Sequence, residues 1–234
     1  MGIQHSFLYP NSTAEHMSES ISFRRWLFVL AAVSLIGDLG SKYLVFGWLY
    51  GHPRHYDPVA RLGSYELIPG AFRLHTQYVA EPAVGWLRRW NAAEMPHVNQ
   101  GALFGLGNEH SVSNAVFAAI SLLAAGAITI WGLRRTTVMD GWISTALGLI
   151  LGGTLGNFFD RVVFGGVRDF LYWYKLIDWP VFNIADCCLV VGASFLLVHA
   201  FLTSPSPTPI DHQMKTGADG SPAGQPAPIT APSP

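Results

Sequence analysis

Four apolar stretches dominate the hydrophobic pattern of the chain, and each is long enough to cross a bilayer, which takes about 20 apolar residues in a helix. They are Trp26–Tyr50, Val112–Leu133, Trp142–Val163 and Val181–Leu202. The second stretch contains no charged residue, whereas the other three carry ionisable groups. The pattern predicts an all-α membrane protein with four transmembrane helices.

Two longer connections separate these spans. Residues 51–111 have aromatic and apolar content of their own, and the alternation through Phe72–Thr76 predicts a short β element near the membrane surface. Residues 164–180 are rich in Trp and Tyr, which is typical of the lipid–water interface. Because the four spans are antiparallel, both connections are expected on the same side of the membrane, opposite the short link 134–141.

The two ends of the chain differ from its middle. Residues 1–23 are polar, residues 24–203 hold the membrane domain, and residues 204–234 are rich in Pro, Ser, Gly and Ala and are predicted to be a disordered tail. The first span follows Arg24 and Arg25, as a signal peptide would. It is too long for a signal h-region and has no small-x-small cleavage site behind it, so we interpret it as an uncleaved anchor.

Composition agrees with a membrane protein. Half of the residues are hydrophobic and 12% are charged, against about 25% charged in soluble domains. The net charge of −1 gives no electrostatic argument for a nucleic-acid partner. Cys187 and Cys188 are adjacent in an apolar run, and we interpret them as small buried residues rather than a disulfide or a metal site. Arginines lie on both predicted sides, so the positive-inside rule does not fix the orientation.

The first span carries a carboxylate and an ammonium group in its apolar sequence. Asp38 and Lys42 lie at i and i+4 on one helical face, where they can pair. A charged group in a spanning helix costs about 2.5–3.5 kcal/mol on insertion scales, so each is a functional candidate. Two interpretations remain open: the pair only neutralises itself and fixes helix packing, or it supports an active site. Pairing holds Asp38 ionised, so we expect no general-acid role for it.

The third span contains the sequence GGTLGNFFDR at residues 152–161. Gly153, Asn157, Asp160 and Arg161 share one helical face. Small residues permit close helix approach, and an asparagine can donate a hydrogen bond across that contact. Many membrane helices use such spacing only for packing, and Asp160 beside Arg161 is also compatible with a simple interfacial charge pair.

Two further aspartates lie near the ends of spans three and four. Asp169 follows the third span, and Asp186 lies about one turn inside the fourth. Antiparallel spans place both near the same membrane level. An aspartyl protease requires one ionised and one protonated carboxyl group, and close carboxyl groups separate their pKa values in this way. The alternative is two unrelated interfacial aspartates.

Six motifs occur in order along the chain: DLGSK at 38–42, IPGAF at 68–72, NQGALFG at 99–105, GGTLGNFFDR at 152–161, VRDF at 167–170 and FNIAD at 182–186. Any one of them can arise by chance. The complete series, over about residues 26–202, resembles the lipoprotein signal peptidase (signal peptidase II) family.

The resemblance implies an aspartic endopeptidase whose catalytic pair is Asp169 and Asp186. The implied substrate is a prolipoprotein that carries diacylglycerol on a cysteine, with cleavage N-terminal to that cysteine. The implied location is the bacterial cytoplasmic (inner) membrane, with the active site facing the periplasm or cell exterior and the N-terminus inside. No metal or organic cofactor is implied, and the oligomeric state is not indicated. The implied supporting positions are Asp38, Lys42, Asn99, Gly101, Asn157, Asp160, Arg161, Asn183 and Ala185.

Among these positions, we expect Asn99 and Asn183 to orient the substrate backbone and Asn157 with Arg161 to hold the polar framework. The stretch 73–98 is longer than the family pattern leads us to expect. Its residues Trp86, Leu87, Arg88, Arg89 and Trp90 fit either an amphipathic segment that caps the site or contacts headgroups, or a solvated loop. The Pro-rich tail matches nothing in the family pattern.

Two other functional classes compete with the protease. A proton-coupled carrier would use Asp38, Lys42, Asp160 and Asp186 as a relay. It requires polar residues through the whole membrane depth, whereas span two has no charge and Asp160 and Asp186 are expected near one side. A non-catalytic scaffold with the same fold is the second alternative.

Overall fold

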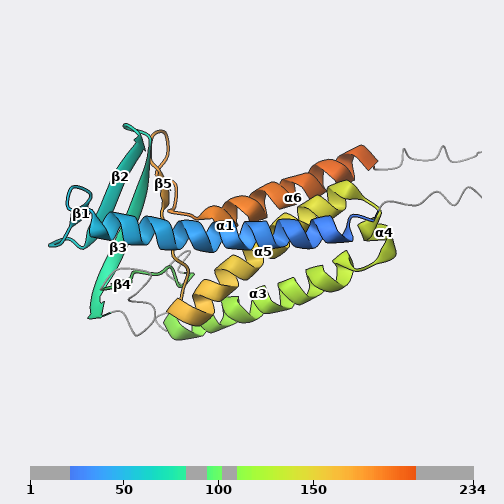
Figure 1. Ribbon diagram of the computed structural model, residues 1–234, viewed down its shortest axis with the longest axis horizontal. Helices are drawn as coiled ribbons and strands as arrows, with labels where there is room; N and C mark the ends of the chain where they lie inside the picture. Colours follow the sequence, from blue (N-terminus) through green and yellow to red (C-terminus); the bar gives the residue numbers. More distant parts are fainter. Residues whose placement is uncertain (1–21, 83–93, 102–109, 204–234) are drawn as a thin grey trace, which may run out of the picture.

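Four long helices lie side by side and a small β-sheet covers one end of them (Figure 1). The computed structural model describes residues 22–82, 94–101 and 110–203. Its long helices are α1 (Arg24–Gly51), α3 (His110–Gly132), α5 (Gly141–Phe164) and α6 (Ile184–Thr203), and α4 (Arg135–Val138) is a short turn of helix. All four long helices are long and apolar enough to cross a membrane, which confirms the predicted spans. The predicted polar segment up to residue 21, the tail from 204 and the Trp86–Trp90 stretch lie outside the described residues.

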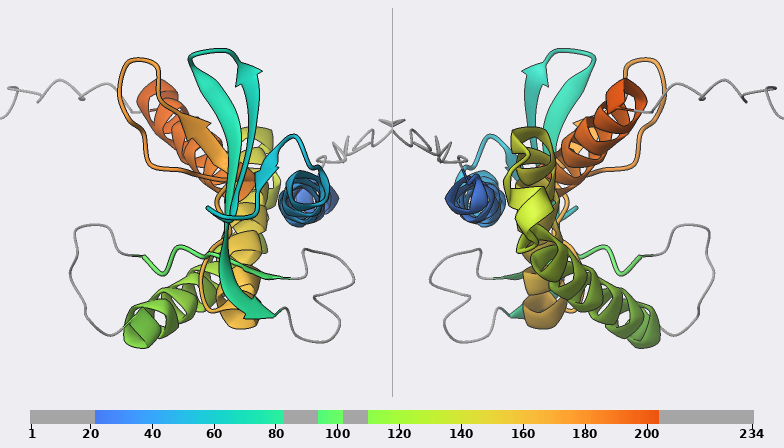
Figure 2. Two further views of the ribbon diagram at one scale, coloured as in Figure 1. Left: turned by 90° about the vertical axis from the view of Figure 1, so that its left-hand side faces the viewer. Right: turned by 90° about the vertical axis from the view of Figure 1, so that its right-hand side faces the viewer.

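Helix α5 lies at the centre of the bundle and contacts α1, α3 and α6 (Figure 2). A Cβ atom added at Gly152 would lie 2.5 Å from the carbonyl oxygen of Ala31 in α1. A Cβ atom added at Gly153 would lie 2.6 Å from the carbonyl oxygen of Ala185 in α6. Adjacent glycines therefore let two different helices approach the same turn of α5 at backbone distance.

The fourth span begins later than the hydrophobic pattern predicted. Residues 181–183 are not helical, and the backbone of Phe182 pairs with Leu171. The helix starts at Ile184 because Asn183 caps it: the backbone N–H of Asp186 donates to Asn183 Oδ1 at 3.0 Å, and the backbone N–H of Asn183 donates to Asp186 Oδ2 at 3.1 Å. This reciprocal pair is a capping box, which fixes the first turn of the helix.

The β element is larger than the short strand expected near Phe72. Strands β1 (Tyr56–Asp57), β2 (Leu62–Ile68), β3 (Phe72–Pro82) and β4 (Glu94–Pro96) pair in sequence order, and β5 (Leu171–Trp173) pairs antiparallel with β3. Because β5 belongs to the connection between α5 and α6, the two long connections meet at one end of the bundle, as predicted.

A cluster of aromatic and apolar residues joins the sheet to the helices. Phe46 of α1 packs with Tyr78, Phe170 and Leu171, and all four side chains are buried. The Tyr78 hydroxyl donates to the carbonyl oxygen of Phe46 at 2.6 Å. The sheet is thereby fixed on the helix ends, next to the segment that carries Asp169.

Candidate active site

Asp169 and Asp186 come from different segments and are held by one residue between them. Asp169 lies in the connection that follows α5, and Asp186 lies in the first turn of α6. The side-chain amide of Asn183 donates to Asp169 Oδ1 at 2.7 Å, while its backbone N–H donates to Asp186 Oδ2. The structure therefore brings together the two aspartates that the sequence singled out.

Two more amides complete the contacts of the carboxyl groups. Asn99 Nδ2 donates to Asp169 Oδ2 at 3.0 Å, and Asn157 Nδ2 donates to Asp186 Oδ1 at 2.8 Å. Every carboxyl oxygen of the pair thus accepts at least one N–H from the protein. Such contacts fix both carboxyl groups in rotation, so that their unused lone pairs point in defined directions.

The two aspartates have different surroundings. The pKa of Asp169 is raised to about 6, mainly by burial and in addition by the negative charge of Asp186, against the opposing hydrogen bonds from Asn99 and Asn183. Asp186 is bound by the N-terminal turn of its own helix, where the positive end of the helix dipole favours a carboxylate. The raised pKa suits Asp169 as the member of the pair that holds a proton.

A cluster of four buried charged groups lies directly behind the pair. Asp38, Lys42, Asp160 and Arg168 have no exposed side-chain surface. Lys42 Nζ lies 2.7 Å from Asp38 Oδ2 and 3.1 Å from Asp160 Oδ2, and Arg168 Nη2 lies 2.8 Å from Asp160 Oδ1. The other oxygen of Asp38 accepts the backbone N–H of Ala185 at 2.9 Å. The cluster balances two negative with two positive charges, and the predicted pairing of Asp38 with Lys42 is confirmed.

Arg168 is the residue of this cluster that the sequence analysis did not single out. Its guanidinium lies 4.3 Å from the ring centre of Tyr43 and 3.9 Å from that of Phe164. Its backbone N–H also donates to Asp160 Oδ2 at 3.0 Å. The sequence feature that could have indicated Arg168 is its place in VRDF, where a charged side chain lies beside Asp169 between the apolar residues Val167 and Phe170.

Arg161 does not form the charge pair with Asp160 that the sequence left open as an alternative. Its guanidinium lies 5.5 Å from the ring centre of Phe117 in α3, and its Nη1 donates to the carbonyl oxygen of Asn157 at 3.3 Å. Asp160 instead bonds Lys42 and Arg168. The interpretation of Asp160 with Arg161 as an interfacial charge pair is therefore wrong, because the turn of α5 directs the two side chains to different neighbours.

Asn99 is held in place by an isolated bridge and by a glycine turn. Its backbone N–H and C=O pair with Val167 at 2.7 and 2.8 Å. The backbone N–H of Gly101 donates to Asn99 Oδ1 at 2.9 Å. Gly101 has φ +92°, and a Cβ there would lie 2.3 Å from the ring of Phe117, so only glycine fits without displacement.

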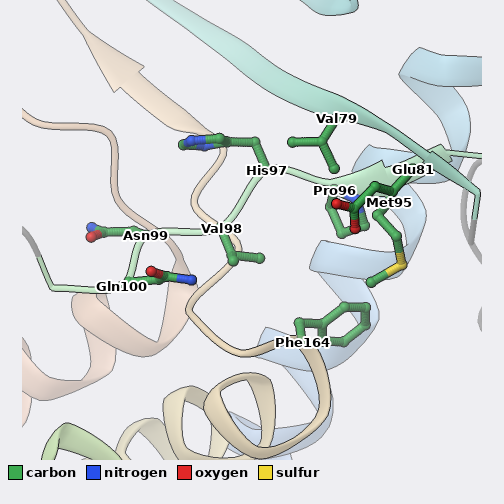
Figure 3. A pocket seen from close by; sticks show the side chains of 9 residues that line it. All are labelled: Val79, Glu81, Met95, Pro96, His97, Val98, Asn99, Gln100 and Phe164. Carbon is green, nitrogen blue, oxygen red and sulfur yellow. The ribbon is translucent and has the colours of Figure 1, made fainter. Parts of the chain in front are cut away.

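The segment that carries Asn99 lines a cavity of about 520 Å³. Figure 3 shows Asn99 pointing to one side of this segment and Val98 and Gln100 to the other, where Met95 and Phe164 lie. Asn99, which donates to Asp169, is itself among the residues that line the cavity. In the part of the chain that the structure describes, no group of three or more His, Cys, Asp or Glu side chains is placed to hold a metal ion.

Comparisons with known proteins agree on one family. The family model for signal peptidase (SPase) II matches residues 30–202. The lipoprotein signal peptidase of Rhodopirellula baltica is 36% identical over 193 residues, which are 77% of this chain and 73% of that protein. The lipoprotein signal peptidase of Aeromonas hydrophila is 39% identical over 106 residues, or 44% of this chain and 62% of that protein.

Solved structures show the same fold. A bacterial membrane enzyme determined by the in meso method at 1.9 Å resolution superposes with a TM-score of 0.58 at 24% identity, over 80% of this chain and 98% of that chain. A second one, at 2.3 Å resolution, gives a TM-score of 0.57 at 22% identity, over 81% and 96%.

Proposed function

Since this chain belongs to the signal peptidase II family, we propose that Asp169 and Asp186 together hydrolyse the peptide bond before the lipid-modified cysteine of a prolipoprotein. The protein is a multi-pass membrane aspartic endopeptidase that removes signal peptides from prolipoproteins. The observation that carries the residue assignment is the pair of carboxyl groups held on Asn183.

The two carboxyl groups have complementary roles in the proposed reaction. Asp186, as carboxylate, takes a proton from a water molecule whose oxygen attacks the scissile carbonyl carbon. Asp169, whose pKa is raised to about 6, donates its proton to the carbonyl oxygen. When the tetrahedral intermediate collapses, the C–N bond breaks. Asp186 returns its proton to the departing amine, and Asp169 takes back a proton from a hydroxyl group, which restores the starting state.

The asparagines divide into two kinds by their remaining hydrogen-bonding capacity. Asn183 Nδ2 donates to both Asp169 and Asn157, and its Oδ1 accepts from Asp186. We therefore assign Asn183 to holding the carboxyl pair rather than the substrate. Asn99 uses one amide N–H on Asp169, which leaves its second N–H to donate to a substrate carbonyl.

The placement of the site suits a lipid-anchored substrate. The carboxyl pair lies where the helices end and the sheet begins (Figure 1). Acyl chains and an apolar signal segment hold a diacylated substrate in the bilayer, so its scissile bond lies close to the headgroups. We propose that this end of the bundle faces the periplasm or cell exterior of a bacterial cytoplasmic membrane.

The test is cleavage of a diacylglyceryl-modified prolipoprotein by purified protein in detergent, with Asp169→Asn and Asp186→Asn. We expect wild type to cut before the lipidated cysteine and each variant to lose at least about 10³-fold in kcat while it remains folded. The control is Thr145→Val, which removes one hydrogen bond accepted from Trp26 and one donated to the carbonyl oxygen of Gly141, both far from the site, and should leave kcat unchanged.

The same experiment separates the competing classes. A wild-type protein without cleavage activity would favour the scaffold, and cleavage that persists in either aspartate variant would remove the residue assignment. The carrier predicts proton-coupled transport in proteoliposomes. In the described residues, the fully buried charged side chains gather in the cluster at the sheet end of the bundle, which supports the protease.

A further inference from the structure

We infer that Lys42 is a positioning residue for the reaction: it fixes the amide of Asn157 in the one orientation that donates to Asp186. This inference rests on the proposed role of Asp186 as the base. It assigns to Lys42 a function beyond the neutralisation of the neighbouring acids.

The orientation of the Asn157 amide follows from its neighbours. Lys42 Nζ donates to Asn157 Oδ1 at 3.3 Å, and Asn183 Nδ2 donates to the same oxygen at 3.2 Å. An ammonium group can only donate, so the amide oxygen must face it. The NH₂ of Asn157 is then directed to Asp186 Oδ1, at 2.8 Å.

The other two amides at the carboxyl pair are oriented by the backbone. Asn99 Oδ1 accepts the N–H of Gly101, and Asn183 Oδ1 accepts the N–H of Asp186. Among the residues that the structure describes, Lys42 is thus the one ionised side chain that orients an amide of the pair. Its contribution can therefore be removed by a side-chain substitution, without altering the backbone.

A reversed Asn157 amide would change the chemistry of Asp186. The amide oxygen would then face Asp186 Oδ1 at hydrogen-bond distance, and two acceptor oxygens can meet only if a proton lies between them. Asp186 would have to carry that proton, and it would no longer accept one from water. The ammonium of Lys42 thus acts on the reaction through Asn157, one residue away from the reacting atoms.

A purely structural role for Lys42 makes different predictions. Lys42 is the ionic partner of Asp38 and shares Asp160 with Arg168. Its loss alone would leave Asp38 buried and unpaired, which destabilises the fold whatever the role of Asn157. The test therefore compares Asp38→Asn, which keeps the ammonium, with Asp38→Asn/Lys42→Met, which removes it and leaves no unpaired charge at residue 38.

We expect Asp38→Asn/Lys42→Met to have a kcat at least about tenfold below that of Asp38→Asn, with KM within about twofold. The acid-side fall of the pH–rate profile should move to higher pH in the double variant. The reason is that a reversed Asn157 amide holds a proton on Asp186, so the base becomes free to accept one only at higher pH. Asp38→Asn/Lys42→Gln, which retains a neutral N–H donor, should recover part of the lost kcat. Melting temperatures in detergent, with Thr145→Val as reference, establish that the variants are folded.

A cycle with Asn157→Ala decides between the two roles. When Asn157→Ala is present together with Asp38→Asn, adding Lys42→Met should lower kcat by less than about twofold, since there is no amide at residue 157 left to orient. An equal loss with and without Asn157, or a double variant with the kcat and pH profile of Asp38→Asn, would overturn the inference. These outcomes leave the proposed function intact, whereas a wild type that cleaves nothing would refute that function and the role of Lys42 with it.

Discussion

The two ends of the helical bundle each pair a carboxylate with a basic side chain, but they do so in different environments. At the sheet end, Asp160 is fully buried between Lys42 and Arg168. At the opposite end, Asp140 bonds His199 at 2.9 Å, with side chains that are 31% and 22% exposed. Breaking a buried pair costs about 3–5 kcal/mol, whereas an exposed pair contributes about 0–1 kcal/mol.

The two carboxylates also differ in the segments that their contacts join. Asp140 caps the helix that follows it, since its Oδ1 accepts the backbone N–H groups of Trp142 and Ile143. Asp160 instead joins α5 to α1 through Lys42 and to the connection that carries Asp169 through Arg168. The comparison teaches that one carboxylate caps its own helix and reaches α6 through a partly exposed contact, whereas the other joins α1, α5 and the connection after α5 through fully buried charges.

The largest effect expected from this comparison follows removal of Arg168. Arg168→Met should lower the free energy of unfolding by about 3–5 kcal/mol, because Asp160 loses a buried partner. Thermal melting in detergent measures this loss, and cleavage activity should fall with it because Asp169 is the next residue. Arg161→Met serves as the matched control, since Arg161 has no carboxylate partner among the contacts described for it. Equal melting temperatures for the two variants would contradict the comparison.

The pH dependence of stability gives the second prediction. The pKa of Asp169 is about 6 in the folded protein against an ordinary value of 3.8. The native state therefore favours the protonated carboxyl group of Asp169. The contribution of this group to the stability of the fold is complete below pH 3.8 and is lost as the pH rises through about 6. At pH 8, Asp169→Asn should have a higher melting temperature than wild type, and its free energy of unfolding should be larger by up to about 3 kcal/mol.

The difference between Asp169→Asn and wild type should shrink as the pH falls from 8 towards 4. Thr145→Val, which leaves every titratable group in place, is the control for the pH dependence of the melting assay itself. A constant difference across this range would show that burial does not perturb the titration of Asp169.

Close packing behind the buried cluster gives the third prediction. A Cβ atom at Gly156 would lie 2.4 Å from Asp38 Oδ2. Gly156→Ala should therefore displace Asp38 from Lys42 and Ala185 and destabilise the protein by about 1–3 kcal/mol. Gly126→Ala in α3, where no atom lies within 4 Å of the added Cβ, should be neutral in the same melting assay; a neutral Gly156→Ala would mean that α1 can move aside.

The smallest effect is expected at the exposed end. His199→Gln should change the free energy of unfolding by less than about 1 kcal/mol and leave cleavage unchanged, because this pair is partly solvated and distant from the reaction. Melting and cleavage at one pH measure both effects. A loss comparable with that of Arg168→Met would show that exposure does not distinguish the two ends.

Most of the bundle could be predicted from the sequence because hydropathy and helical spacing are local properties. The four spans and the bond between Asp38 and Lys42 depend on residues within a few turns of each other. The pairing of β5 with β3 was not predicted, since nothing in Leu171–Trp173 indicates a partner about a hundred residues earlier.

The sequence predicted which residues form the site better than it predicted which of them contact one another. The expected positions Asn99, Asn157 and Asn183 all contact the carboxyl pair. Sequence proximity left the adjacent Arg161 open as a partner of Asp160, whereas in the structure Arg168, buried against Tyr43 and Phe164, is the arginine that pairs with it. Such a choice depends on the three-dimensional path of the connection, which no periodicity encodes. The assignment of Asp169 and Asp186 as catalytic residues stays a prediction until the substitutions are made.

The capping box at the start of α6 gives one carboxylate two simultaneous tasks. Asp186 closes the first turn of the helix through Asn183 and is also the proposed base. Fraying of that helical turn would therefore inactivate the enzyme, since breaking the bonds between Asn183 and Asp186 also releases the carboxylate from its proposed catalytic position. The opening rate of a single helical turn, measurable by amide hydrogen exchange at Asp186, thus sets how long the enzyme stays continuously competent between openings.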